Sequence, residues 1–307
     1  MKRCAVKELK IYMYDDKSEI KKCDSVYENN HVKIEWDNNK GIISWFDKIN
    51  EIELIDGNSK TGAFMPVYEI TKGDGQTTDA QYRVRQVLGR NMRGKNGKVY
   101  YPNINSVEVV EMGDVFGKIH LKLDLEGTSL MEVVIKIYND ITRADVNIIV
   151  NKDSVWDPES LYVALPFALN NKKMKLLCEK TGCVIQAKKD QLPGTNCDFY
   201  LVQDGVALKE GNFGVSIAMP DSSLIYTSEL KYENSKKLFS EKYTDAKDYE
   251  LYSWTMNNIW ETNFKASLGG FVEFNYYMNW CNDNKSIDSL IDSNKYMNTG
   301  FVNYRID

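Results

Sequence analysis

Short runs in which apolar and polar residues alternate constrain the fold of this chain more than any other feature of its sequence. In residues 119–125 four aliphatic side chains alternate strictly with polar ones, and residues 32–36 repeat the pattern. Alternation with a period of two places one face of a β-strand in a core and the other in solvent. We therefore expect β-sheets, rather than helices, to build this protein.

The spacing of these runs indicates antiparallel pairing. Residues 32–36 are followed closely by the run 42–46, which predicts a hairpin with its turn at Asp37–Lys40. Further runs follow one another across short polar connections, such as Asn139-Asp140; they are 119–125, 131–138 and 146–150. Because a parallel pair needs a crossover of a dozen or more residues, we expect a meander.

Seven later segments also have the composition of strands. They are 161–169, 184–188, 199–208, 214–219, 224–228, 251–257 and 271–278. The segments 71–80 and 89–98, rich in Gly, Asn, Thr and charge, suit hairpin tips, with a turn at Lys95–Lys98. The charged segment 231–249 predicts a long excursion, and apolar residues at helical spacing predict one short helix within 285–297.

Composition bounds the class of protein. The 307 residues are 43% hydrophobic and 12% aromatic, enough for the core of one large sandwich domain. The net charge is −5 and the basic residues are scattered, which argues against nucleic acid as a partner. No apolar run approaches the roughly 20 residues that a membrane-spanning helix needs. No apolar signal region follows Met1, so we expect a cytoplasmic protein, unless the chain is a piece of a larger secreted one.

The residue types that carry most enzyme chemistry are scarce. The two histidines, His31 and His120, alternate with apolar strand positions, so we expect both to face outward. The six cysteines show neither a CxxC pair nor zinc-ligand spacing, and we expect them reduced and mostly buried. Phosphate-loop, esterase and zincin motifs do not occur. We therefore expect no complete active site and no metal ligands in this chain.

Two stretches, 190–203 and 254–264, place polar residues among aromatic ones. Sugars are held by hydrogen bonds to amides and carboxylates while aromatic rings cover their C–H surfaces. The candidate substrate-binding residues are Asp190, Gln191, Gln203, Asn258, Trp260 and Asn263. The alternative interpretation is that the amides satisfy neighbouring backbone groups and the aromatic rings fill the core.

The same stretches resemble the C-terminal region of glycoside hydrolase family 38, the α-mannosidases. The matching segments span about residues 26–278 and are 28–32, 41–48, 137–145, 158–167, 190–203, 214–221 and 252–264. The resemblance implies an all-β fold, an antiparallel β-supersandwich of the galactose-mutarotase-like kind with few short helices. In the family this sandwich follows a (β/α) barrel that holds zinc through histidines and aspartates. No position here matches those motifs, so we expect zinc in a missing catalytic domain and no cofactor in this chain.

The resemblance also implies a division of the chain and a role for it. We expect an N-terminal segment at 1–25, compatible with the end of a missing upstream region, a supersandwich domain at 26–280, and a tail with a short helix at 281–307. The leading hypothesis is a structural, cleft-completing and carbohydrate-binding part of an α-mannosidase-like glycoside hydrolase, not catalytic alone. Its partners would be mannose-containing glycans and a catalytic barrel, in the same parent chain or a separate one.

Two alternatives stay open at this point. The chain could be a free-standing carbohydrate-binding module that uses Trp260, Asn258 and Asn263, or a mutarotase-like sugar-processing domain with its own acid and base. If the sandwich docks against a barrel, it must carry an apolar or aromatic surface, which we expect near the loops 190–194 and 257–263.

Overall fold

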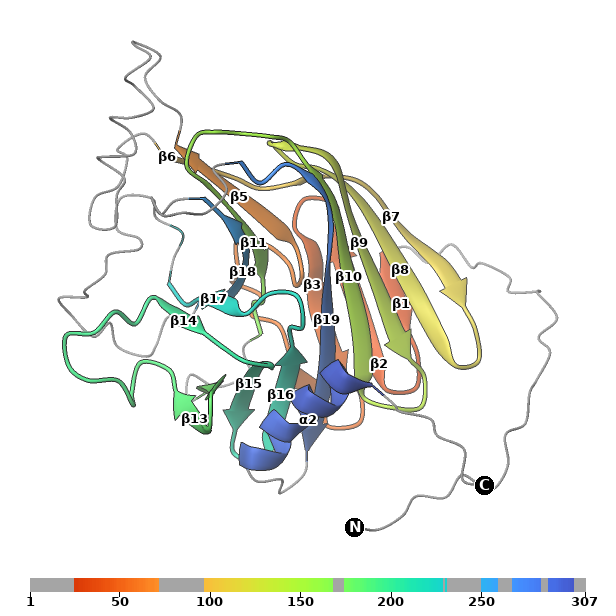
Figure 1. The fold of residues 1–307 in the computed structure, drawn as a ribbon. Coiled ribbons are helices and arrows are strands. Elements are labelled where there is room, and N and C mark those ends of the chain that lie inside the picture. The colour runs from red at the N-terminus through yellow and green to blue at the C-terminus, as the bar shows by residue number, and fades with distance from the viewer. Residues whose placement is uncertain are drawn as a thin grey trace, which may run out of the picture.

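The protein is built almost entirely from antiparallel β-sheets (Figure 1). The computed structural model describes residues 25–71, 97–167, 174–228, 230, 250–258, 267–282 and 287–300. These residues form three sheets, of nine, six and four strands, and one helix, α2 (Ile287–Thr299). The all-β, antiparallel fold class predicted from the alternating runs is confirmed.

The largest sheet has nine strands in the order β13-β12-β15-β16-β19-β10-β9-β8-β7. Their bounds are β7 Asn103–Met112, β8 Phe116–Asp124, β9 Thr128–Tyr138, β10 Arg143–Lys152, β12 Lys175–Lys180, β13 Cys183–Gln186, β15 Gly205–Glu210, β16 Phe213–Ala218 and β19 Gly270–Asn282. The strands β8 to β10 form the predicted meander, and β7, which was not predicted, extends it at the edge of the sheet. The long strand β19 joins the meander to the later strands, because it pairs with β10 on one side and β16 on the other.

The six-stranded sheet has the order β14-β17-β18-β11-β5-β6. Its strands are β5 Pro66–Thr71, β6 Gly97–Tyr100, β11 Glu159–Ala164, β14 Phe199–Leu201, β17 Leu224–Tyr226 and β18 Tyr252–Asn257. The central strand β11 is buried on both faces. One face of this sheet contributes to the main core, and the other packs a separate aromatic cluster in which Tyr162 stacks on Trp254 at a centroid distance of 5.5 Å.

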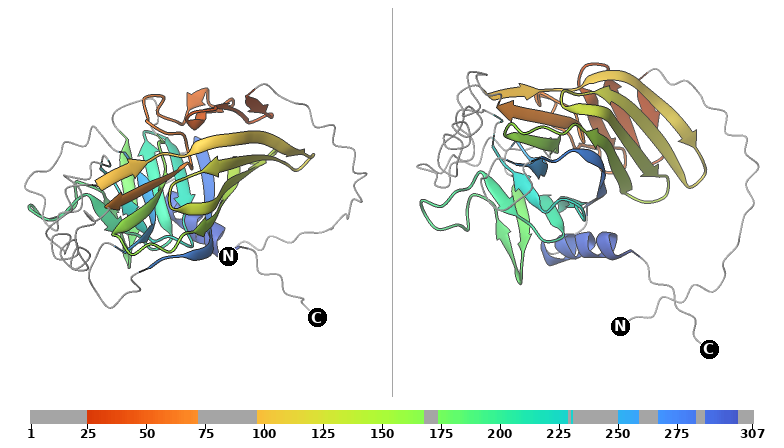
Figure 2. Two further views of the ribbon diagram at one scale, coloured as in Figure 1. Left: turned by 90° about the horizontal axis from the view of Figure 1, so that it is seen from above. Right: turned by 45° about the horizontal axis from the view of Figure 1, so that its top comes forward.

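The four-stranded sheet is the layer formed by the first described strands (Figure 2). Its strands are β1 Val26–Glu28, β2 Val32–Asp37, β3 Gly41–Asp47 and β4 Ile52–Glu53. Trp45 of β3 meets Trp280 of β19 edge to face, with ring centroids 5.8 Å apart. This contact joins the small sheet to the nine-stranded one inside a single main core.

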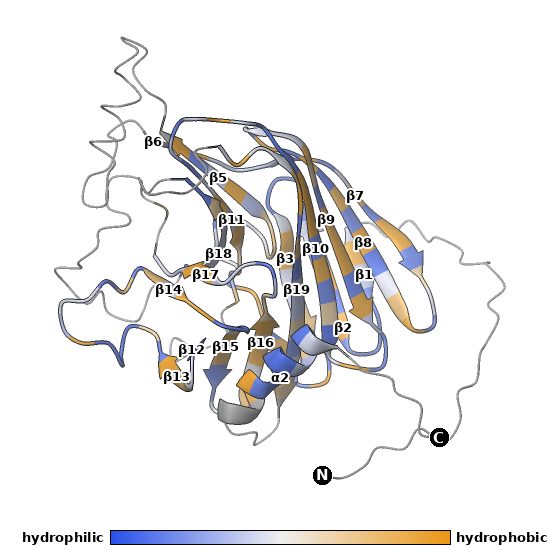
Figure 3. Cartoon of the chain, viewed as in Figure 1, coloured by the Kyte–Doolittle hydropathy of each residue, from blue (hydrophilic) through white to orange (hydrophobic). Residues whose placement is uncertain are grey.

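Several predicted local features are confirmed. The turn between β2 and β3 follows Asp37, whose carboxylate accepts hydrogen bonds from the backbone N–H groups of Asn39 and Lys40 at 2.7 and 2.9 Å. The predicted short helix is α2. Figure 3 shows the alternation of hydropathy along the strands on which the prediction of sheets rested.

Three predictions are corrected by the structure. The segment 199–208 is not one strand, because the chain leaves β14 and enters β15 of another sheet after residues 202–204. Gly97 and Lys98 begin β6 instead of completing a turn, since they pair with Thr71 and Ile70. Strand β12 was not predicted at all. The excursion 231–249 and residues 72–80 and 89–96 of the predicted hairpin tips lie outside the described residues.

Candidate functional site

Asp190 and Gln191 lie in the loop between β13 and β14, and their side chains bind that loop itself. The backbone N–H of Gln186 donates to Asp190 Oδ2 at 2.6 Å. Gln191 Oε1 accepts a hydrogen bond from the Tyr200 hydroxyl at 3.1 Å, and its Nε2 donates to the carbonyl of Gln186 at 3.4 Å. Both side chains therefore shape the local backbone.

Asn258 follows β18 and fixes the start of β11. Its Oδ1 accepts a hydrogen bond from the backbone N–H of Glu159 at 2.7 Å, and its Nδ2 donates to the carbonyl of Asp157 at 3.2 Å. The remaining two candidates of this stretch, Trp260 and Asn263, lie outside the described residues.

Strand register keeps the two predicted stretches apart. Phe199 pairs with Tyr226, and Tyr226 pairs with Tyr252. Asn258 lies six residues beyond Tyr252 along β18, which at about 3.3 Å per residue is about 20 Å. Gln203 lies in a third place, exposed beside the cavity next to α2. The structure does not gather the described candidates into one site, and their sugar-binding role stays a prediction.

Exposed apolar side chains do occur at one of the two predicted loops. Leu192, inside the loop 190–194, is 76% exposed, and Leu201 of β14 is 60% exposed. Large apolar side chains with this much exposure are candidates for contact with another protein surface.

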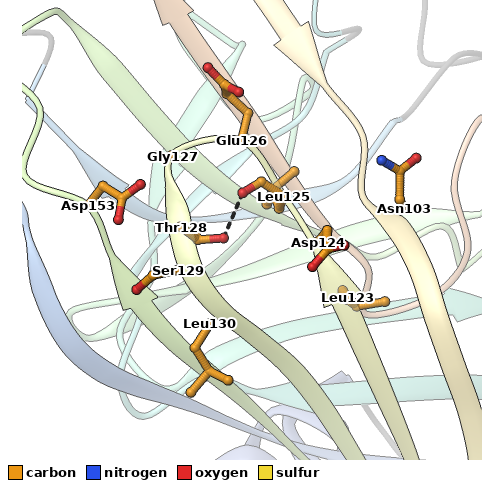
Figure 4. Close-up of a pocket in the computed structure, with 10 residues that line it drawn as sticks. All are labelled: Asn103, Leu123, Asp124, Leu125, Glu126, Gly127, Thr128, Ser129, Leu130 and Asp153. Atoms are coloured by element: carbon orange, nitrogen blue, oxygen red, sulfur yellow. Dashed lines mark hydrogen bonds between the residues drawn. The ribbon is translucent and has the colours of Figure 1, made fainter.

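A pocket with a polar lining lies at the turn between β8 and β9 (Figure 4). Its volume is about 390 Å³. The polar side chains that line it are Asn103, Asp124, Glu126, Thr128, Ser129 and Asp153. Carboxylates, an amide and hydroxyls at the surface of one hollow form a suitable set of hydrogen-bond partners for the hydroxyl groups of a sugar.

The turn that builds this pocket depends on Gly127, whose φ of +76° favours glycine. A Cβ at this position would lie 2.7 Å from the ring of Tyr68, so the turn packs directly on that ring. The Thr128 hydroxyl donates to the carbonyl of Leu125 at 2.7 Å, and the backbone N–H of Asp153 donates to the carbonyl of Gly127 at 2.9 Å. These bonds join the turn to the segment that follows β10.

Behind the pocket a buried ion pair fixes both ends of the segment 153–158. Lys152 Nζ at the end of β10 lies 2.6 Å from Glu159 Oε2 at the start of β11, and both side chains are 1% exposed. Tyr68 donates its hydroxyl to the same carboxylate oxygen, and Lys152 Nζ lies 4.9 Å from the centre of its ring. The segment between the paired residues, which carries Asp153 and Trp156, is therefore held in place by buried charges.

Burial dominates the protonation of this cluster. Removal from water raises the pKa of Glu159, against the opposing hydrogen bonds from Lys152 and Tyr68. The pKa of the Tyr68 hydroxyl is also raised, first by burial and then by its bond to the Glu159 carboxylate. Glu159 Oε1 is buried, and no described residue forms a hydrogen bond with it. How strongly this cluster, which we call the anchor, holds the segment 153–158 therefore depends on whether the Glu159 carboxyl group is charged.

Two exposed aromatic side chains are linked to the pocket residues, one by strand register and one by its place in the sequence. Leu130, which lines it, pairs across the sheet with Asn151, and Asn151 pairs with Phe271. Directly paired residues share a face of the sheet, so Phe271, which is 61% exposed, lies two strands from Leu130 on the outer face. Trp156 is 59% exposed and follows Asp153 by three residues. We call the pocket together with Trp156 and Phe271 the rim site.

The sequence analysis did not single out the rim site. A usable signal was present, because Asp153-Ser154-Val155-Trp156-Asp157 also places an aromatic side chain among polar ones. Neither described histidine lines the pocket of Figure 4. His120 is on the outer face of β8, with its Nε2 3.2 Å from Glu132, as expected for a strand residue that faces away from the core.

The described residues offer neither a cluster of metal ligands nor a membrane-spanning helix. Within them, no three His, Cys, Asp or Glu side chains gather in a way that could hold a metal ion. The zinc that the family implies therefore does not fit this part of the chain. None of the described helices is long and apolar enough to cross a membrane.

The described strands define an antiparallel all-β protein of stacked sheets, and comparison with known sequences gives its family. The sequence model of the glycosyl hydrolases family 38 C-terminal domain matches residues 27–228, well over half of the chain. The chain belongs to this family, which confirms the predicted resemblance. No curated protein matches the sequence.

Two solved structures from Enterococcus faecalis share the fold, and a third match has a lower score. An α-mannosidase from Enterococcus faecalis V583 matches with a TM-score of 0.57 at 12% identity, covering 91% of this chain and 31% of the other. A family 38 protein from Enterococcus faecalis matches with a TM-score of 0.59 at 12% identity, covering 91% and 32%. A putative aldose 1-epimerase from Escherichia coli K12 matches with a TM-score of 0.43 at 9% identity, covering 83% and 98%. The chain thus spans about a third of the two Enterococcus proteins.

Proposed function

We propose that this chain is the C-terminal, cleft-completing β-sandwich part of an α-mannosidase-like glycoside hydrolase, with mannose-containing glycans as ligands and no catalysis of its own. One observation carries the proposal: the matching family model is that of a C-terminal domain, and the chain corresponds to about a third of an α-mannosidase. The family and the fold of the chain are those of a C-terminal domain of this kind. Its ligands and its role in completing a cleft are what we propose.

The rim site supports the carbohydrate-binding part of the proposal. Asp124, Glu126 and Asp153 supply hydrogen-bond acceptors, and Ser129 a hydroxyl, around one hollow. The exposed ring of Trp156 offers an apolar face for the C–H surface of a sugar. The turn and the segment after β10 are fixed by the buried ion pair, so the side chains that they carry are held ready for a ligand.

A catalytic barrel is the partner that this function requires. Zinc and the residues that attack the sugar would be supplied by that barrel, in the same parent chain or in a separate one. The exposed Leu192 and Leu201 are candidate contacts with it. A cytoplasmic location, and domain boundaries at 25/26 and 280/281, stay predictions.

The test is to express the chain together with the coding sequence directly upstream of it. We expect the upstream sequence to encode a barrel that hydrolyses an aryl α-mannoside with zinc, and deletion of residues 26–280 to abolish this turnover. Full activity after the deletion would contradict the proposal, as would an upstream region that encodes no barrel.

The role of the rim site is tested in the same protein, expressed together with its upstream region. Trp156→Ala and Asp153→Asn should raise KM for a mannose oligosaccharide several-fold and leave the melting temperature nearly unchanged, because both side chains are exposed. Phe116→Leu in β8 serves as an aromatic control that does not line the pocket. Unchanged KM in both rim variants would remove the rim site from the proposal.

A further inference from the structure

We propose that the cavity between α2 and the hairpin of β12 and β13 is a second binding site, for a neutral sugar unit, separate from the rim site. The choice of a sugar as ligand rests on the proposed function. The cavity has a volume of about 600 Å³, within the range of small-molecule sites. Its polar lining residues are Glu179, Lys180, Gln203, Asp292 and Lys295.

The strongest observation is a buried carboxylate oxygen that the protein leaves unbonded. The Glu179 side chain is 5% exposed, and its Oε1 lies 3.0 Å from Lys295 Nζ. Its Oε2 is buried, and no described residue donates a hydrogen bond to it. This oxygen has almost no accessible surface, so the Glu179 carboxylate must turn toward the cavity to accept a ligand hydroxyl. That hydrogen bond would offset the free-energy cost of a buried acceptor without a donor.

The surroundings of Glu179 make it a strong acceptor that is sensitive to its neighbours. Burial raises its pKa, the Lys295 ammonium group opposes that rise, and the Asp204 carboxylate adds to it. A ligand hydroxyl would stabilise the ionised carboxylate by hydrogen bonding.

The charges around the cavity select for a neutral ligand. Among the side chains that line the cavity, two carboxylates, Glu179 and Asp292, are matched by two ammonium groups, Lys180 and Lys295, and Lys295 lies 3.0 and 3.6 Å from the two carboxylates. The Asp204 carboxylate acts on Glu179 but does not line the cavity. An anionic ligand is repelled by the carboxylates, and a cationic ligand is repelled by the ammonium groups. A neutral ligand with several hydroxyl groups can use all of these side chains without introducing a net charge.

The other residues that line the cavity supply an amide group and apolar side chains, both of which are typical of sugar-binding sites. The exposed amide of Gln203 can donate and accept at once, which suits a hydroxyl group. Val184 and Ile291 supply an apolar wall for the C–H face of the ring. Gln203 was among the predicted substrate-binding residues, and this cavity is where the structure places it.

The helix wall of the cavity is firmly attached. Ser216 donates its hydroxyl to the carbonyl of Leu290 at 2.9 Å, and Asn294 Nδ2 donates to the carbonyl of Val206 at 3.1 Å. Leu290 also packs on Gly214, where a Cβ would lie 2.6 Å from its side chain. The wall is therefore preorganised, and binding need not pay for ordering the helix.

The test is calorimetric titration of the full chain with methyl α-mannoside, mannose 6-phosphate and mannosamine. We expect the neutral sugar to bind at least tenfold more tightly than either charged one. Glu179→Gln, which replaces half of the acceptor by a donor, and Gln203→Ala, at an exposed position, should each weaken binding at least fivefold. Glu108→Gln, on the distant edge strand β7, is the matched charge control and should bind as the unmodified chain does.

A second readout places the ligand in this cavity. Cys183 is exposed and lines it, so bound sugar should slow alkylation of Cys183, measured by peptide mass, several-fold. Binding that leaves the Cys183 rate unchanged, or that survives both variants, overturns the second site and leaves the proposed function standing. Loss of barrel-dependent turnover on deleting 26–280 tests the proposed function separately, so the two proposals can fail independently.

Discussion

At the scale of single residues, the buried ion pair of Lys152 and Glu159, with the Tyr68 hydroxyl, has a large effect on the free energy of folding. Taking two opposite charges out of water is costly, and the pair stays favourable only while both partners are present. The pair also fixes the segment that carries Asp153 and Trp156, so its loss should affect both stability and the rim site.

We predict that Lys152→Met lowers the free energy of unfolding by about 3–5 kcal/mol at pH 8, because Glu159 is left buried without its cation. At pH 5 the deficit should be smaller, since Glu159 can then take up a proton. Urea denaturation at the two pH values measures both effects. A deficit that does not change with pH would show that Glu159 does not bear the penalty.

The sign of the pH effect follows from the direction of the shift. Burial raises the pKa of Glu159 in the folded protein, so the folded state binds this proton more tightly than the unfolded state does. Its contribution to stability is therefore fully present below the unfolded pKa and declines as the pH rises through the folded pKa. Glu159→Gln, combined with Lys152→Met, should abolish the pH dependence that this group causes and recover part of the lost stability.

The described cysteines should differ sharply in reactivity. Cys178 is buried, and burial raises the pKa of its thiol to about 12, whereas Cys183 is exposed. Because the thiolate is the reacting form, iodoacetamide at pH 8 should modify Cys183 within minutes and leave Cys178 unmodified in the folded protein. Peptide mass mapping measures this, with denatured protein as the control. Rapid labelling of Cys178 would contradict the buried position of β12.

At the scale of elements, the turn between β8 and β9 carries the pocket, and its geometry can be tested against a matched turn. Gly127 and Gly182 have similar φ values, +76° and +82°. A Cβ at Gly127 would lie 2.7 Å from the Tyr68 ring, whereas nothing lies within 4 Å at Gly182. The two glycines thus separate backbone strain from steric contact.

We predict that Gly182→Ala costs about 1–2 kcal/mol, the strain of a left-handed backbone alone. Gly127→Ala should cost at least about 1 kcal/mol more, because Tyr68 must also move. Thermal and urea denaturation measure the difference. Equal losses in the two variants would mean that the turn does not pack on Tyr68.

The elements that the sequence predicts well are those whose pattern is local. In β8, β9 and β10 one face is buried and the other is not, so alternation shows each strand directly. In β12 four successive residues, from Leu176 to Glu179, are buried, and the alternation that would have revealed the strand is absent.

Other features depend on contacts between distant parts of the chain. The change of sheet before β15 requires Gly205, where a Cβ would lie 2.1 Å from the carbonyl oxygen of Ile217, a residue on the neighbouring strand. The rim site likewise joins residues from β7, the turn after β8 and the segment after β10. Sequence predicted the kind of side chain that such a site would use, but strand register decided which of them meet.

On the scale of the whole molecule, the described surface carries exposed apolar side chains, among them Leu192, Leu201, Trp156 and Phe271. The chain covers about a third of the α-mannosidases whose fold it shares. A surface that contacts the remaining two thirds of such an enzyme would carry exposed apolar side chains of this kind. We propose that the sandwich supports catalysis by a partner barrel and does not catalyse hydrolysis itself.

The measurement that tests this claim most directly is hydrolysis of an aryl α-mannoside by the purified chain alone, with and without added zinc. We predict no turnover above the uncatalysed rate in either condition, because the family model that the chain matches is that of the C-terminal domain. The same assay on an α-mannosidase of known activity provides the positive control. Zinc-dependent turnover that follows the purified chain through successive columns would contradict the account.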